Sequence, residues 1–268
     1  MGTEVRIIGR RAGVVSPRRA LAELRSAGMR VALLAALFTL GSVPLPSAGA
    51  AQTTATPRAY ALIDVTVASM WTRPTGPRPV DRPSLTNPVN LYGWLGALTT
   101  AQRVWLTNHL IDQGLYGQQV AIWKQRGAWD RISLTGQATR SGLTLPGWVP
   151  ARQLTTPTPA TAGATQPPPS GPQAVVAVRR TWLYAQTTGG SRGRRLLHLS
   201  FDTRLPEVGH SPDGRWTIVQ TPAGTDALLA SSAVVIRNPA TPPPPPTGRQ
   251  LVRKASMFLG LPYLWAGT

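Results

Sequence analysis

The stretch Gln119-Val-Ala-Ile-Trp-Lys-Gln-Arg-Gly-Ala-Trp-Asp-Arg-Ile-Ser-Leu134 decides the fold. Its two halves, 119–124 and 128–134, place apolar and polar residues in the near-alternation that is typical of strands with one buried face. Between them, residues 125–127 end in a glycine that suits a tight hairpin turn. The stretch therefore predicts an antiparallel hairpin within a small β module.

The residues on either side extend this module. Residues 61–70 alternate well enough to predict a strand, with Trp71 at its end. Residues 73–90 carry five prolines, which predict an irregular, solvent-covered loop. Apolar residues at helical spacing predict a helix over 101–113. Short strands within 146–154 are expected to close the module, whose expected bounds are residues 52 and 154.

A second module is expected at 174–237. The tetrapeptide Asp213-Gly214-Arg215-Trp216 parallels Arg126-Gly127-Ala128-Trp129, which indicates an internal duplication. Two Pro-rich linkers flank the second module. Residues 155–173 lack apolar periodicity, and residues 238–247 contain a run of five prolines typical of polyproline II.

Composition agrees with small modules joined by linkers. Of 268 residues, 26 are Gly and 27 are Pro, and only 14% are charged. There is no cysteine, which excludes disulfides, thiolate metal sites and a thiol nucleophile within these residues. The formal net charge is +18, but the arginines are scattered among prolines and loops without a nucleic-acid-binding motif. Attraction to an anionic cell envelope accounts for this charge more simply, and an Arg-rich coding bias more simply still.

The N-terminal part predicts export. An apolar run begins at Met29, is broken after Leu40 and is followed by the small-residue pattern Ala48-Gly49-Ala50. This is the anatomy of a secretory signal peptide, expected at 29–51. Residues 1–28 are then an N-terminal extension or a misassigned start. A secreted or envelope location is expected, with no stable membrane span after cleavage because the apolar core is too short.

The C-terminal stretch predicts a helix over 248–260, with Thr247 as its N-cap and Gly260 at its end. One face of this helix would be apolar, and so short a segment offers no core to bury it. We therefore expect 248–268 to be the first element of a further domain. The residues of the apolar face are Leu251, Val252, Ala255 and Leu259.

This ending resembles the NlpC/P60 family of cell-wall peptidases. The family's Pro-Tyr-x-Trp-Gly-Gly segment is matched by Pro262, Tyr263, Trp265 and Gly267, whereas Ala266 replaces the commoner glycine. The resemblance implies a papain-like α+β domain whose Asp-Cys-Ser-Gly motif and histidine base would lie beyond Thr268. It implies hydrolysis of a γ-D-glutamyl to diamino acid amide in peptidoglycan stems. Without these residues, the chain as given is expected to be inactive.

The first module is similar to a bacterial SH3 barrel. The similarity rests on Gly117-x2-Val120-x-Ile122, Gly127-x-Trp129-x2-Ile132 and Gly147-Trp148-Val149-Pro150. The stretch from Met70 to Pro83 resembles the opening of the extended SH3 variant that precedes NlpC/P60 domains. The expected fold is therefore mainly β, with two SH3-like barrels, the first carrying a helical insert, followed by the first helix of an incomplete peptidase domain.

Candidate site residues are few. By resemblance, Tyr263 would lie beside the peptidase cleft and contact substrate. Trp71 and Trp94 are candidates for a ligand groove, against the plainer alternative that such aromatics pack in a core. Neither a cofactor nor a metal is expected, because the histidines lie far apart without partners at ligand spacing. Those histidines are His109, His198 and His210, and the aspartates expected only in turns, caps or on the surface are Asp64, Asp81, Asp112 and Asp130.

The leading interpretation is an exported bacterial cell-wall protein, the N-terminal part of a cysteine endopeptidase whose SH3-type modules bind the wall and gate the substrate. The expected partner is peptidoglycan or a muropeptide stem, and nucleic acid is not expected. The alternative is a stand-alone peptidoglycan-binding module without an enzymatic role. An unpaired apolar helix face at 248–260 discriminates against that alternative, since a finished binding module has no need of one.

Overall fold

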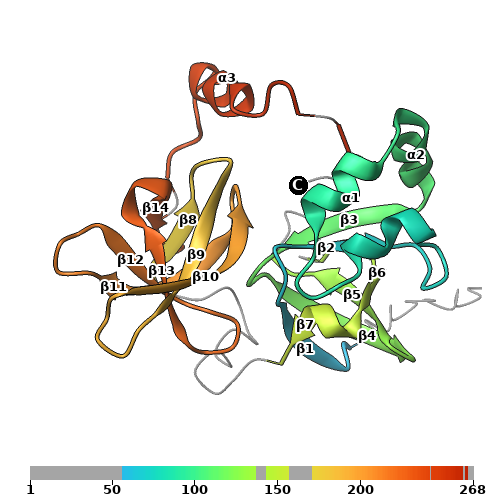
Figure 1. The fold of residues 1–268 in the computed structure, drawn as a ribbon, viewed down its shortest axis with the longest axis horizontal. Coiled ribbons are helices and arrows are strands. Elements are labelled where there is room, and N and C mark those ends of the chain that lie inside the picture. The colour runs from blue at the N-terminus through green and yellow to red at the C-terminus, as the bar shows by residue number, and fades with distance from the viewer. Residues whose placement is uncertain (1–55, 137–142, 157–170, 242, 262, 265–268) are drawn as a thin grey trace, which may run out of the picture. The chain divides into compact units, whose positions relative to one another are not determined.

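The computed structural model describes residues 56–136, 143–156, 171–241, 243–261 and 263–264 (Figure 1). All of them fall within one compact unit of the chain, Thr53–Thr268. The expected signal peptide at 29–51, most of the linker at 155–173, and Pro262, Trp265, Ala266 and Gly267 lie outside the described residues.

The first of two sheets has seven strands in the order β3-β2-β6-β5-β4-β1-β7. The expected hairpin is confirmed as β4 and β5, which pair antiparallel from Val120 opposite Leu134 to Arg126 opposite Trp129. The strands of this sheet are β1 Ala59–Ile63, β2 Val67–Trp71, β3 Leu110–Leu115, β4 Gln119–Arg126, β5 Trp129–Leu134, β6 Gly147–Pro150 and β7 Leu154–Thr155.

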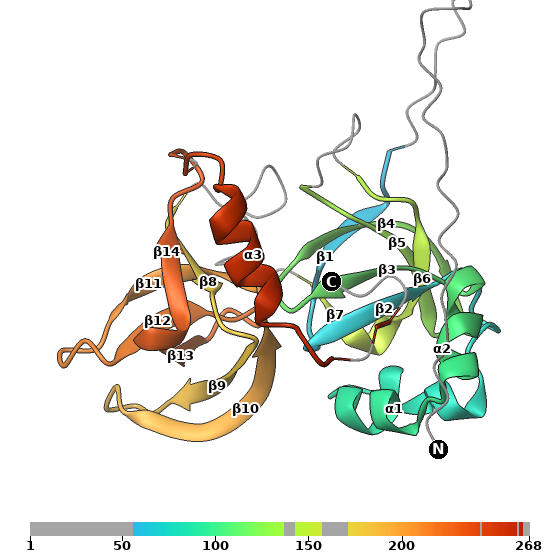
Figure 2. The same ribbon diagram turned by 90° about the horizontal axis from the view of Figure 1, so that it is seen from above.

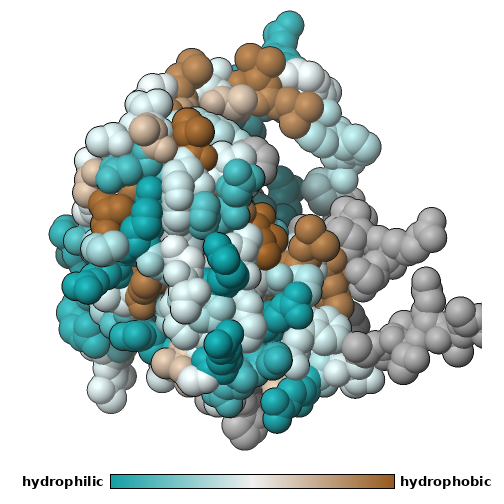
Figure 3. Space-filling view, turned by 90° about the vertical axis from the view of Figure 1, so that its right-hand side faces the viewer, coloured by the Kyte–Doolittle hydropathy of each residue, from teal (hydrophilic) through white to brown (hydrophobic). Residues whose placement is uncertain are grey.

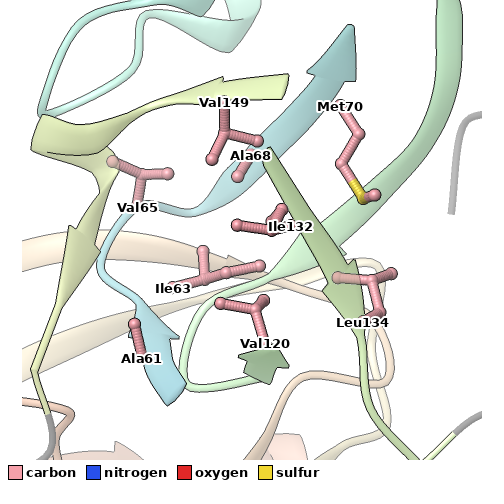
Figure 4. Packing of buried hydrophobic residues seen from close by; sticks show 9 residues of the cluster. All are labelled: Ala61, Ile63, Val65, Ala68, Met70, Val120, Ile132, Leu134 and Val149. Atoms are coloured by element: carbon pink, nitrogen blue, oxygen red, sulfur yellow. The ribbon is translucent and has the colours of Figure 1, made fainter. Parts of the chain in front are cut away.

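Alternation along these strands builds a hydrophobic core on one face of the sheet. Figure 4 shows its side chains pointing toward one another from β1, β2, β4, β5 and β6. Val120, Ile132 and Val149 are fully buried within it. Removing this apolar surface from water is the main contribution to the stability of the sheet.

Two expectations for this region were wrong. The single strand expected at 61–70 is two strands, because the chain turns at 64–66, where the Asp64 amide donates to the Gln153 carbonyl. The helix expected over 101–113 is shorter. It comprises α2, Thr100–Trp105, and a 3-10 turn at Leu106–Asn108, after which β3 pairs with β2. Tertiary pairing outweighs helical spacing here, and Leu106 and Leu110 are buried from different elements.

The segment expected to be a solvent-covered loop contains ordered structure. Pro79–Ser84 forms a 3-10 helix, and Asn90 caps α1, Leu91–Ala97, by accepting a hydrogen bond from Gly93 N. Asp81 and Ser84 are buried rather than solvated. In Figure 1, α1 and α2 lie together at the end of the sheet formed by β2 and β3.

The second sheet also has seven strands, in the order β10-β9-β13-β12-β11-β8-β14. Its hydrophobic core is centred on Leu183, Leu199 and Val219, all fully buried. The strands are β8 Gln173–Val176, β9 Arg180–Gln186, β10 Arg192–Ser200, β11 Arg204–His210, β12 Trp216–Gln220, β13 Asp226–Ala230 and β14 Val234–Arg237.

The two sheets share one topology. Each strand of the second sheet occupies the place of the strand seven positions earlier in the first. Trp129 opens β5 and Trp216 opens β12, and each follows a turn glycine with positive φ, Gly127 at 56° and Gly214 at 68°. A 3-10 turn precedes the last strand of both sheets. This repetition of order and detail supports the expected internal duplication.

The C-terminal helix is α3, Gly248–Ser256, four residues shorter than expected. Thr247 caps it as expected, accepting a hydrogen bond from Gln250 N, and Gly260 follows with a φ of 81°. Its apolar side chains are uncovered, with Leu251 55% and Val252 67% exposed. Leu259, which was expected on the same face, lies beyond the end of the helix and is 75% exposed. In Figures 1 and 2, α3 lies beside β8 and β14. Within the described ranges, no helix combines the length and hydropathy that crossing a membrane requires.

Candidate functional site

An aromatic cluster fills the space between the first sheet and its helices. Trp71 comes from β2 and Trp94 from α1, and their ring centroids lie 6.3 Å apart. Both side chains have no exposed surface. This arrangement follows from the sequence, because the helical segment between β2 and β3 needs an apolar contact with the sheet to remain in place. The buried aliphatic members of the cluster are Leu98, Leu106 and Leu110.

A buried carboxylate orders this cluster. Asp81 has a fully buried side chain and accepts hydrogen bonds from Arg78 Nε at 2.8 Å and from Trp94 Nε1 at 2.9 Å. The Arg78 guanidinium also lies 3.8 Å from the ring centroid of Trp105. Burial by itself raises the pKa of Asp81, but the hydrogen bonds and charge of Arg78, together with the Trp94 donor, outweigh it and leave this pKa below its usual value.

Replacing Asp81 with asparagine is expected to lower the free energy of unfolding at pH 7 by about 2 kcal/mol, because Arg78 loses its charged partner. An Asp with a lowered folded-state pKa stabilises the fold above its unfolded-state pKa, near 4, and this stabilisation is lost as the pH falls through the folded-state value. The difference between wild type and Asp81→Asn should therefore narrow below about pH 4. Urea unfolding at pH 7, 5 and 2 measures it, and a difference that is unchanged at pH 2 would contradict the assignment.

The expectation that Trp71 and Trp94 line a surface groove is corrected by their burial. Rings with 0% exposure pack in a core and offer no face to a ligand in this structure. Two buried donors of the same region, Trp71 Nε1 and Arg103 Nη1, have no hydrogen-bond partner among the described residues. The face in Figure 3 carries its hydrophobic residues in small separate groups.

Tyr263 is 76% exposed, and the next residue, Leu264, packs against the aromatic cluster. The structure thus brings the segment with the expected substrate-contacting tyrosine to the cluster that holds Trp71 and Trp94. It unites the three candidates in one region, with only Tyr263 accessible. The described residues contain no group of three His, Cys, Asp or Glu side chains that could hold a metal ion.

Two of the three histidines lie against tryptophan rings, and the third lies near a carboxylate that the sequence pattern did not assign to it. His109 stacks on Trp105 with centroids 3.3 Å apart. His198 lies 3.4 Å from the Trp182 ring by centroids. Burial lowers the pKa of His198, and nearby Arg180 and Arg195 lower it further. His210 is 3.7 Å from Glu207.

Sequence reasoning missed the burial of three residues of this part of the chain, Asp81, Tyr116 and Asp130, the last of which is 7% exposed on β5. Asp81 was expected in a turn, at a cap or on the surface. It does cap the 3-10 helix, because its carboxylate accepts a hydrogen bond from the Arg78 backbone amide, but its side chain is buried. Its i,i+3 spacing from Arg78 is the pattern of an ion pair within one turn. Tyr116, in the turn between β3 and β4, was not singled out, although it is 4% exposed and belongs to the hydrophobic core of the second sheet. No local pattern in the sequence signals a contact between residues so far apart.

The described residues therefore define a mainly β protein of two sheets with one topology, whose last segment lies against an aromatic cluster. No protein-family model matches the chain. It is 36% identical over 211 residues to a γ-D-glutamyl-L-lysine dipeptidyl-peptidase of Bacillus cereus, covering 78% of this chain and 60% of that protein. It is 29% identical over 204 residues to a γ-D-glutamyl-L-lysine dipeptidyl-peptidase of Bacillus subtilis, covering 75% and 62%.

The structural comparison agrees. The crystal structure of an NlpC/P60 family protein from Bacillus cereus matches with a TM-score of 0.68 and 35% identity, over 78% of this chain and 67% of that one. The chain belongs to the NlpC/P60 family. It spans 60% and 62% of the length of the two curated relatives.

Proposed function

We propose that this chain is the wall-directed part of an exported bacterial cysteine peptidase that hydrolyses γ-D-glutamyl to diamino acid amides in peptidoglycan stems. The observation that carries the proposal is the 36% identity over 211 residues to a dipeptidyl-peptidase of that specificity. A thiolate would attack the amide and a histidine would act as base. Because these 268 residues contain no cysteine, the nucleophile would come from residues after Thr268.

Within this proposal, each sheet is an SH3-type barrel, and the helices between β2 and β3 are an insert in the first. The support is the shared strand order, the glycine turn before Trp129 and Trp216, and the 3-10 turn before each final strand. The barrels would bind the wall and gate access of the stem peptide. Tyr263, exposed beside the aromatic cluster, is the residue proposed to contact that peptide.

The 268-residue chain by itself is expected to release no product from L-Ala-γ-D-Glu-L-Lys, because it has no thiol to form the acyl-enzyme. The measurement is chromatography of the reaction after prolonged incubation, with the Bacillus cereus relative as positive control. Hydrolysis that persists in iodoacetamide would contradict a cysteine mechanism.

Reading the coding DNA after the Thr268 codon tests the peptidase proposal itself. An open frame that continues into Asp-Cys-Ser-Gly, with a histidine further on, is the expected result. A stop codon at that point would overturn the peptidase assignment and favour the stand-alone wall-binding module. Co-sedimentation of the chain with purified peptidoglycan tests wall binding separately, and full recovery in the supernatant would count against it.

A further inference from the structure

Arginine is concentrated on one hairpin of the second sheet. Residues 179–195 contain five arginines and no Asp or Glu. All five are exposed, and none forms an ion pair with a carboxylate of the described residues. The hairpin is β9 and β10. Arg180, Arg192, Arg194 and Arg195 lie on its strands, and Arg179 directly precedes β9.

Aromatic rings hold several of these guanidinium groups. Trp182 and Tyr184 alternate with the buried Leu183 on β9, so they share the outer face of the strand. Arg195 lies 5.0 Å from the Trp182 centroid. Arg192 lies 5.1 Å from Tyr184 and 5.5 Å from Trp216. Such cation–π contacts limit side-chain freedom, which reduces the entropy lost when the arginines bind a ligand.

The surroundings favour an anion over a flat base as the ligand. Trp182 is half-buried and lies against His198, with ring centroids 3.4 Å apart and planes tilted by 30°. Tyr184 and Trp216 pack edge-on with centroids 5.5 Å apart. Proteins that bind single-stranded nucleic acid use aromatic faces that are free to stack on bases. Here the rings are occupied in positioning arginines. Arg180 and Arg195 also contribute to lowering the pKa of His198, as a positive local potential does.

We propose that the β9–β10 face of the second sheet binds a linear acidic carbohydrate polymer, in which phosphate or carboxylate groups recur along sugar or polyol units. Its anionic groups would pair with Arg192, Arg194 and Arg195, because the guanidinium fork matches both phosphate and carboxylate oxygens. This surface and ligand are separate from the stem peptide of the proposed peptidase reaction. The inference does not rest on that reaction.

The test is binding of the full 268-residue chain to poly(glycerol phosphate) and to polygalacturonate, measured by isothermal titration calorimetry at several salt concentrations. Neutral dextran and oligo(dT) are the comparison ligands. Binding to an acidic carbohydrate, with weaker binding to oligo(dT) and none to dextran, is expected. No binding to either acidic carbohydrate, or binding to oligo(dT) that is equal or tighter, would overturn the proposal.

Two triple variants that remove the same charge distinguish binding by the β9–β10 face from non-specific attraction due to the net charge of the protein. Changing Arg192, Arg194 and Arg195 to glutamine should weaken binding at least about tenfold and reduce the slope of log affinity against log salt by about two. The control triple, Arg237, Arg249 and Arg253 to glutamine, removes the same charge from exposed positions elsewhere and should bind like wild type. Equal losses in both triples would show non-specific attraction and refute the proposal.

The plainer role of these arginines is to protect an edge, since β10 ends the strand order of its sheet. Size-exclusion chromatography with light scattering tests that role. Self-association of the β10 triple with unchanged polymer affinity would assign the arginines to edge protection and overturn the binding proposal. Equal melting temperatures of wild type and both triples would show that any loss of affinity is not a loss of fold.

Discussion

Trp71→Ala is expected to lower the free energy of unfolding by about 3–5 kcal/mol, among the largest effects of any single substitution in the first sheet. Trp71 has no exposed surface, pairs with Leu110 and Trp148 across two neighbouring strands, and packs against Trp94. Alanine would leave a cavity between sheet and helices. The rigid pairing of β2 on both sides limits how far the surroundings can collapse into that cavity.

Urea unfolding followed by far-ultraviolet circular dichroism measures this loss. Tyr263→Ala is the control, because an aromatic side chain that is 76% exposed should change the free energy of unfolding by less than about 0.5 kcal/mol. If Trp71→Ala lowered the free energy of unfolding no more than Tyr263→Ala does, the aromatic cluster would not be a packed core. The interpretation of Trp71 and Trp94 as residues of a ligand groove would then be favoured.

Tyr116→Ala is expected to cost about 3 kcal/mol and to separate the unfolding of the two sheets into distinct transitions. Tyr116 lies in the turn between β3 and β4 of the first sheet, but its side chain is buried in the core of the second sheet with Leu183, Leu199 and Leu205. The neighbouring Gly117 has a φ of 78°, and a Cβ there would lie 2.6 Å from Leu205 Cδ2. The positive φ favours glycine at this position, and a larger residue would also require Leu205 to move.

The same residue predicts sensitivity to alkali. Burial, and secondarily the charge of Asp64, raises the pKa of Tyr116 above its ordinary value near 10. The stability that depends on the neutral phenol is then complete below about pH 10 and is lost as the pH rises further. Thermal unfolding from pH 8 to 11 should show this fall in wild type and a smaller one in Tyr116→Phe. Identical profiles would contradict the burial of the phenol.

Local sequence patterns correctly predicted those elements that depend on interactions between residues close in the chain. The hairpin of β4 and β5 followed from alternation around Gly127, and the start of α3 followed from the capping residue Thr247. The helix expected over 101–113 failed at its second half. There, Leu110 satisfies helical spacing and strand alternation equally, and pairing with β2 decides between them.

The site was less predictable because its determinants are non-local. Asp81 lies in a proline-rich segment that resembles a surface loop. Its spacing from Arg78 indicates an ion pair, but its burial also depends on the contact with Trp94, thirteen positions later. Trp71 and Trp94 could have lined a groove or a core, and sequence alone gave no measure of burial. The motif in the sequence identified Tyr263 as a candidate substrate contact. That it lies exposed beside the aromatic cluster could be seen only from the structure, in which the next residue, Leu264, packs against the cluster.

Two copies of one strand order in a single chain create a hazard during folding, since each strand has a second acceptor of the same geometry. Exchange of β5 with β12, for example, would give a swapped and misfolded species. The two sheets differ in one of the connections that determine which strands can pair with each other. Thr187–Ser191 joins β9 to β10 in a tight turn, whereas residues 72–109 with their helices separate β2 from β3. Short loops close first, so the second sheet can commit its β9–β10 hairpin before the first sheet assembles. Divergence between the copies is thus a means of keeping each strand with its own sheet.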